Sequence, residues 1–180
     1  MKKLLYASVF LFATSIYAQE PVKNISEEST IKTVKTNNGS EIVEKKIKVT
    51  TRQEQGIEFA EKDIDKRDKD VVNSPVKITK TIEVDGDKGN SYESKTEIAY
   101  YEFEGKQYGF KKVDNGFSVL STTSELPEGN IVKLNKSNHY IYQNGDDTGV
   151  GYFNEDGSFT IEYFDKKTGA ITSQTYTLRK

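Results

Sequence analysis

The chain has 180 residues, with 26 basic and 28 acidic side chains, a single histidine and no cysteine. A net charge of −2 argues against a nucleic-acid partner, because such proteins carry clustered Lys and Arg on one face. Without cysteine, disulfide bonds are excluded, and the fold has to be held by side-chain burial and strand pairing.

The first residues have the order of a secretory signal peptide. Two lysines precede an apolar run over residues 4–13, and a short, more polar stretch leads to Ala18. A charged start, an apolar centre too short to span a membrane and a small residue at the cleavage point are typical of such peptides. We therefore expect removal of residues 1–18 by cleavage between Ala18 and Gln19. The mature chain then has no transmembrane segment and an extracytoplasmic location, periplasmic or secreted. The Lys- and Asn-rich composition indicates a bacterial protein.

Aromatic residues are concentrated in the second half of the chain. After position 18 there are sixteen Tyr and Phe residues, and all except Phe59 lie between Tyr92 and Tyr176. Each large aromatic side chain can bury on the order of 150–250 Å². Residues 76–180 therefore hold nearly all the material for a core, and we expect them to form an aromatic-rich β domain that can fold alone.

Residues 19–75 form a polar N-terminal segment with one predicted hairpin. β-Branched residues, a turn at Asn37-Asn38-Gly39 and a second alternating run predict a β-hairpin over residues 30–52. Residues 53–75 are rich in both signs of charge and have few apolar side chains, so they indicate a solvated, charged linker.

The second half has the pattern of an antiparallel meander. Short runs of alternating apolar and polar residues are separated by tight turns rich in Asn, Asp and Gly, such as Asn115-Gly116. No run has a helical period. The sequence predicts a mainly β fold with about eight short strands after the hairpin and linker, arranged as a curled sheet, a sandwich or a small barrel.

The sequence contains no group of residues typical of a catalytic, cofactor-binding or metal-binding site. His139 lies on a predicted strand beside Ile141, which favours an ordinary strand residue over a catalytic base. The turn that begins at Asp85 opens like a calcium loop. However, Gly89 and Thr96 stand where further oxygen ligands are required. We therefore expect a hairpin turn there, no cofactor and no enzymatic activity.

Two predicted strands carry aromatic side chains on both faces. Tyr101 and Phe103 alternate with Tyr100, and Phe164 lies on the face opposite Tyr163. A sheet with one covered side needs only one apolar face. Either a second layer covers the other face, with the N-terminal hairpin as a candidate cover, or the aromatics bind a ligand. On the second interpretation, Tyr101, Phe103 and Phe164 are the candidate ligand-facing residues.

These patterns favour an exported, non-enzymatic protein that binds or scaffolds through its sheet surface. Its partner would be a protein, a glycan or another envelope component. One alternative is a small β-barrel that carries an apolar ligand. Another is a hydrolase with an unrecognised site, for which the sequence offers many acidic residues but no distinctive pair.

The signal-peptide hypothesis predicts that the exported protein begins at Gln19. N-terminal sequencing or the intact mass of material recovered outside the cytoplasm checks this position. A product that retains residues 4–13 would contradict both the cleavage site and the expected location.

Overall fold

The structure is a computed structural model that describes residues 22–37, 39, 41–63, 65–86, 91–124 and 127–179. The expected signal peptide, with its cleavage position between Ala18 and Gln19, lies outside these residues. Gly89 of the acidic turn also lies outside them.

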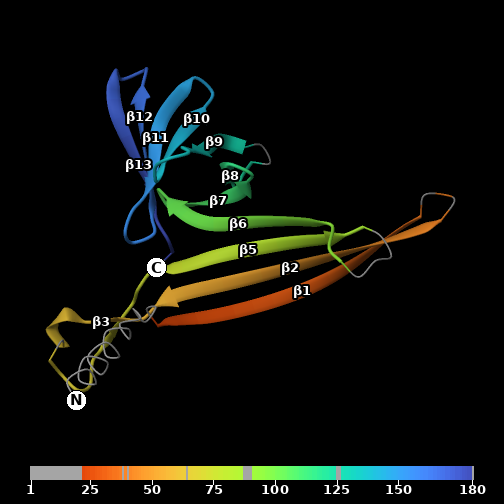
Figure 1. Cartoon of the computed structure of the whole chain (residues 1–180), viewed down its shortest axis with the longest axis horizontal. Coiled ribbons are helices and arrows are strands. Elements are labelled where there is room, and N and C mark those ends of the chain that lie inside the picture. Colours follow the sequence, from red (N-terminus) through yellow and green to blue (C-terminus); the bar gives the residue numbers. More distant parts are fainter. Residues whose placement is uncertain are drawn as a thin grey trace, which may run out of the picture.

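Eleven strands form one antiparallel sheet in which the spatial order follows the chain order (Figure 1). These strands are β1 (Lys23–Asn37), β2 (Ile42–Gly56), β5 (Val76–Asp85), β6 (Ser94–Phe103), β7 (Lys106–Val113), β8 (Gly116–Ser121), β9 (Pro127–Lys133), β10 (His139–Asn144), β11 (Asp147–Phe153), β12 (Phe159–Asp165) and β13 (Ala170–Tyr176). The prediction of a mainly β antiparallel meander is confirmed. The ladder of paired strands runs from β1 to β13 without closing, so the observed architecture is the curled sheet and not the barrel.

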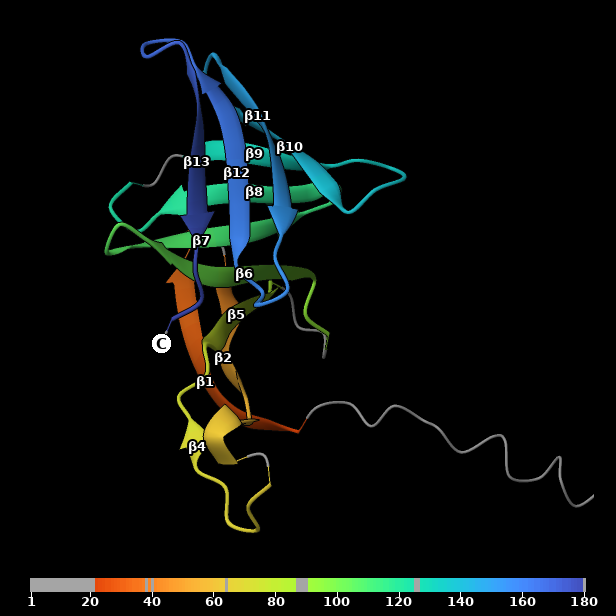
Figure 2. The same ribbon diagram turned by 90° about the vertical axis from the view of Figure 1, so that its left-hand side faces the viewer.

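The sheet curls so that its second half crosses over its middle. Strands β10–β13 run across β7–β9 in Figure 2, and the core fills the space between these two layers. Phe110 on β7 meets Phe159 on β12 edge to face, with 5.5 Å between ring centroids. The buried hydrophobic residues are Tyr101, Phe110, Val119, Ile131, Tyr140, Tyr142, Phe159, Ile161 and Tyr176.

A glycine allows one of these rings to approach the backbone of the neighbouring strand closely. Gly151 on β11 is buried, and a Cβ at this position would lie 2.5 Å from Cζ of Phe159 on the neighbouring strand. Only a residue without a side chain leaves room for the ring there. The glycine thus allows Phe159 to be completely buried.

The end of the chain returns to the middle of the sheet. Glu102 on β6 and Thr177 exchange two backbone hydrogen bonds of 2.8 and 2.9 Å, and the N–H of Val76 donates to the carbonyl of Arg179. These are isolated bridges and not a continuous ladder. They hold the curled layers together at the point where β5 and β6 enter the core.

Strands β1, β2 and β5 extend sideways from the curled part, and we call them the wing (Figure 1). The predicted hairpin is present and longer than expected, with pairing from Lys23 with Gly56 to Asn37 with Ile42. It joins the sheet edge-on, because β2 pairs with β5. The face of β6 that carries Tyr101 and Phe103 is covered by strands β10–β13 and not by the hairpin, which corrects the candidate cover considered from the sequence.

The charged segment between β2 and β5 has local structure of its own. A two-stranded ribbon, β3 (Glu58–Phe59) with β4 (Val71–Val72), flanks a 3-10 turn at Glu61–Asp63. The Asp63 side chain is buried and accepts hydrogen bonds from Lys66 Nζ at 2.5 Å and from the Asp70 N–H at 3.1 Å. The bond from Lys66, followed by that from Asp70, holds the pKa of the Asp63 carboxyl below its usual range. This part of the predicted linker is therefore organised around a carboxylate.

We expect two phenylalanines, one in the core and one outside it, to differ strongly in their contribution to the free energy of unfolding. We expect Phe110→Ala to lower the free energy of unfolding by about 3–5 kcal/mol, because it removes a buried ring from close packing. Phe164→Ala, at a half-exposed ring, should change it by less than about 1 kcal/mol. Urea unfolding followed by circular dichroism measures both variants. If the two variants lowered the free energy of unfolding by similar amounts, the assignment of the core would be contradicted.

Candidate functional site

Of the three aromatic residues singled out from the sequence, the structure places Tyr101 and Phe103 at one core and leaves Phe164 apart from them. Tyr101 is 4% exposed and packs on Phe110, with 4.7 Å between ring centroids. Phe103 is partly buried, 5.2 Å from the ring of Tyr176. Phe164 lies on the outer face of β12, opposite Ile171, and is 49% exposed. Only Phe164 is substantially open to solvent.

Burial of the core tyrosines changes their acid–base behaviour. Desolvation, with a smaller contribution from Tyr140, raises the pKa of Tyr101 from 10.0 to about 12. Desolvation also raises the pKa of Tyr176 well above its usual range. Both groups favour the neutral form in the folded protein, as expected for phenols removed from water.

The wing has a second apolar surface, on the side of the sheet that faces away from the core. Cross-strand register places Val49 opposite Ile82, Ile47 opposite Val84, and Ile78 opposite Tyr100. With Ile98, these half-buried residues form what we call the outer stripe, namely Ile47, Val49, Ile78, Ile82, Val84, Ile98 and Tyr100. In the described part of the chain, no second layer of strands packs on the outer stripe.

The outer stripe ends at a glycine of β7, and two lysines lie beside its residue Ile98. Gly109 lies between Tyr100 and Leu120, and a Cβ there would lie 2.9 Å from Cγ2 of Ile98. Neighbouring side chains therefore cover this position. Lys80 Nζ lies 5.5 Å above the Tyr100 ring, a cation–π distance. Lys80 and Lys111 both lie opposite Ile98. Lys80 shares its face of β5 with Ile78 and Ile82, so one positive charge stands within the outer stripe and the other at its edge.

The other face of the wing carries ion pairs. Lys48 Nζ lies 3.2 Å from Glu83, and Lys35 Nζ lies 3.3 Å from Glu44. Arg52 bonds Glu54 at 2.7 Å. Exposed pairs of this kind each contribute little to stability. They make this face polar, and the two faces of the wing therefore differ in chemistry.

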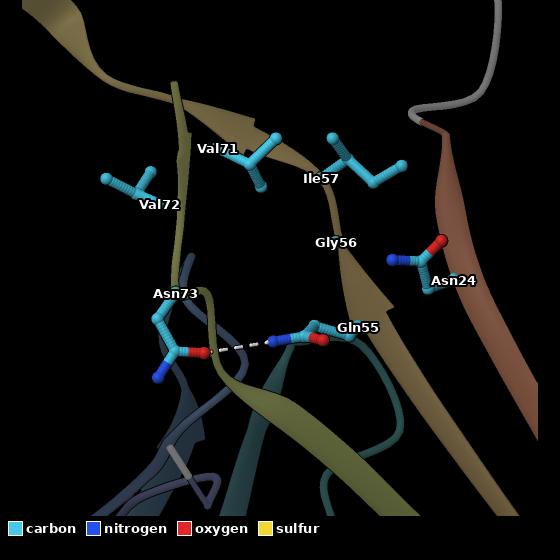
Figure 3. Close-up of a pocket in the computed structure, with 7 residues that line it drawn as sticks. All are labelled: Asn24, Gln55, Gly56, Ile57, Val71, Val72 and Asn73. Carbon is cyan, nitrogen blue, oxygen red and sulfur yellow. Dashed lines mark hydrogen bonds between the residues drawn. The ribbon is translucent and has the colours of Figure 1, made fainter.

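A shallow pocket of about 280 Å³ lies where the wing meets the segment after β4 (Figure 3). Gln55 Nε2 donates to Asn73 Oδ1 at 3.2 Å and to the carbonyl of Ser74 at 2.9 Å. Val71 and Val72 line it and are exposed. The Gln55 amide is thus already engaged in holding the end of β2 to the residues just before β5.

The polar residues considered for chemistry serve local structure. The backbone N–H of His139 donates to Ser137 Oγ at 3.2 Å, a local bond at the start of β10. Asp156 accepts from the N–H and the hydroxyl of Ser158, at 2.9 and 2.6 Å, and shapes the turn before β12. Among the described residues, no group of three or more His, Asp or Glu side chains is placed to hold a metal ion.

Comparison with known proteins gives no relative from which a role can be transferred. No protein family, no curated protein and no solved structure matches the chain. In the described ranges, no helix has the length and apolar character needed to cross a membrane.

The sequence contained the signal for the outer stripe. Val76, Ile78, Ile82 and Val84 alternate with polar residues such as Lys77 and Thr79, which is the pattern of one apolar strand face. Alternation alone does not say whether such a face lies in the core. The pairing of β5 with β6 shows that this face of β5 lies on the same side of the sheet as Tyr100. Tyr101 lies on the opposite side.

The raised pKa of Tyr101 predicts a specific pH dependence. A folded-state value above the unfolded one stabilises the protein fully below pH 10, and this contribution is lost as the pH rises towards 12. Tyr101→Phe removes the ionisable group, so the midpoint of alkaline unfolding should move to higher pH. Tyr100→Phe, on the outer face of the same strand, is the matched control. Fluorescence and absorbance titrations measure both. A midpoint unchanged by Tyr101→Phe would contradict this assignment.

Proposed function

We propose that the protein is an exported, non-enzymatic binding or scaffolding protein that recognises a protein partner through the outer stripe. The observation that carries this proposal is an apolar surface of six aliphatic residues and Tyr100 on one face of a sheet, without a covering layer in the described chain. Contiguous apolar patches of this kind on soluble proteins mark interaction sites. The function is thus assigned to the wing, and the curled part serves as its support.

The chemistry of the outer stripe favours protein over glycan as the partner. Most of its residues are Ile and Val, whose branched side chains pack on other apolar side chains. Tyr100 is its single aromatic residue, and Lys80 lies over that ring. Lys80 within the outer stripe and Lys111 at its edge suit a partner surface that is apolar and carries acidic side chains, since complementary charge favours encounter and register.

The filled interior weighs against the carrier alternative. An apolar ligand would need the space between the two layers, which is occupied by Phe110, Phe159 and Tyr140. These rings stand 5.5–5.6 Å apart at their centroids and are buried. The surface of the wing can form a large apolar contact without displacing these rings.

The proposal is tested by placing a photo-reactive amino acid at Ile82 in the full-length protein expressed in its own cells. We expect a discrete crosslinked product from Ile82 and none from Thr81, which lies next to it on the opposite face. Mass spectrometry identifies the partner. Equal crosslinking from both positions, or none from Ile82, would contradict recognition through the outer stripe.

A further inference from the structure

The edge strand β1 is an unusually long free edge. Along its whole length, from Lys23 to Asn37, one side pairs with β2, and no described strand pairs with its other side. Its apolar residues Ile25, Ile31 and Val34 are exposed. An edge of this length presents a row of backbone donors and acceptors that can template another strand.

The register of the hairpin shows which backbone groups point outward. The N–H of Ile57 donates to the carbonyl of Val22 at 3.2 Å, directly beyond the Lys23–Gly56 pair. In a strand, the N–H and C=O of one residue point to the same side, and the side alternates from residue to residue. The even-numbered residues of β1 therefore face β2, and the odd-numbered ones present their backbone groups to the outer edge.

We propose that β1 pairs with β1 of a second copy of this chain, antiparallel and centred on Thr30. In this register Lys23 lies opposite Asn37, so the whole strand is paired. The two sheets become one continuous sheet across a two-fold axis perpendicular to it. Such a contact is closed, because the same edge is used on both copies. The inference is independent of the function proposed for the outer stripe.

Charge complementarity selects this register. Glu28 lies opposite Lys32, and the symmetry creates this pair twice. Both side chains are exposed, and neither has a charged partner among the described residues. By contrast, Glu27 and Lys35 already have partners within the wing, at 3.9 and 3.3 Å. Three charges of β1 thus remain available, namely Lys23, Glu28 and Lys32. In this register Lys23 lies opposite Asn37, so Glu28 and Lys32 form the only charge pair between the two strands.

Strand geometry brings these free charges close together. Even-numbered residues of β1 would occupy the non-hydrogen-bonded positions of the new pairing. Opposite side chains approach most closely there, with about 4.5 Å between Cα atoms. Centring the pairing on Ser29 would place Lys23 opposite Lys35, which like-charge repulsion disfavours. Centring it on Ile31 would leave Glu28 opposite Val34.

A charge swap tests the proposal on the mature full-length chain. Sedimentation equilibrium at low salt should show a dimer for the unchanged protein. Glu28→Lys and Lys32→Glu should each weaken dimerisation by about tenfold or more, because each replaces two attractions by two repulsions. The double variant Glu28→Lys/Lys32→Glu should restore the dimer. An equimolar mixture of the two single variants should form a heterodimer. Lys166→Glu, in a turn far along the sequence, is the control.

A second variant tests the backbone pairing. Thr33→Pro removes an outward N–H and is compatible with an edge strand, so it should abolish the dimer while the hairpin with β2 is kept. Circular dichroism of every variant verifies the β fold. A protein that stays monomeric at about 0.1 mM would overturn the proposal. So would a dimer that is insensitive to the charge swaps and to Thr33→Pro, or oligomers that grow without limit with concentration.

Discussion

The packing of aromatic rings around Phe110 is the interaction on which the rest of the structure depends. The ring of Phe110 on β7 contacts Tyr101 on β6, Phe117 on β8, Phe159 on β12 and Tyr176 on β13. One side chain thereby joins the middle of the sheet to its far end. A flat meander could not make these contacts, so burying this ring requires β10–β13 to cross back over β7–β9.

The wing relies on this core without contributing to it. Strand β6 belongs to both parts, because Tyr101 faces the core while Tyr100 continues the outer stripe. Further out, the sheet is a single layer stabilised by hydrogen-bond ladders, exposed ion pairs and lateral contacts of aliphatic side chains. Each of these contributes modestly. Local stability should therefore decrease from β6 through β5 and β2 to β1.

Local patterns in the sequence were sufficient for the strands and for most turns. Alternation over 76–84 and the Asn115-Gly116 turn depend on neighbouring residues only, and both appear in the structure. The arrangement of strands in layers depends on contacts between residues far apart in the sequence. The sequence alone therefore could not distinguish β10–β13 from the hairpin as the layer that covers the aromatic face of β6. For the same reason, Tyr101 and Phe164 looked equivalent in the sequence but differ in burial, from 4% to 49% exposed. The burial of the Asp63 carboxylate depends on hydrogen bonds from Lys66 and Asp70. No pattern in the charged segment distinguishes Asp63 from its acidic neighbours in the sequence.

Because the hairpin of β1 and β2 is a single layer, its length can change without a change in the core. The end of β1 and the start of β2 lie far from the aromatic core (Figure 1), so residues added to these strands there disturb no packing between layers. Two residues inserted in each strand keep every side chain on its face and lengthen the hairpin by about 7 Å. A single inserted residue would exchange the polar and apolar faces beyond it. Homologous chains could therefore diverge in arm length in steps of two residues while the curled part stays constant.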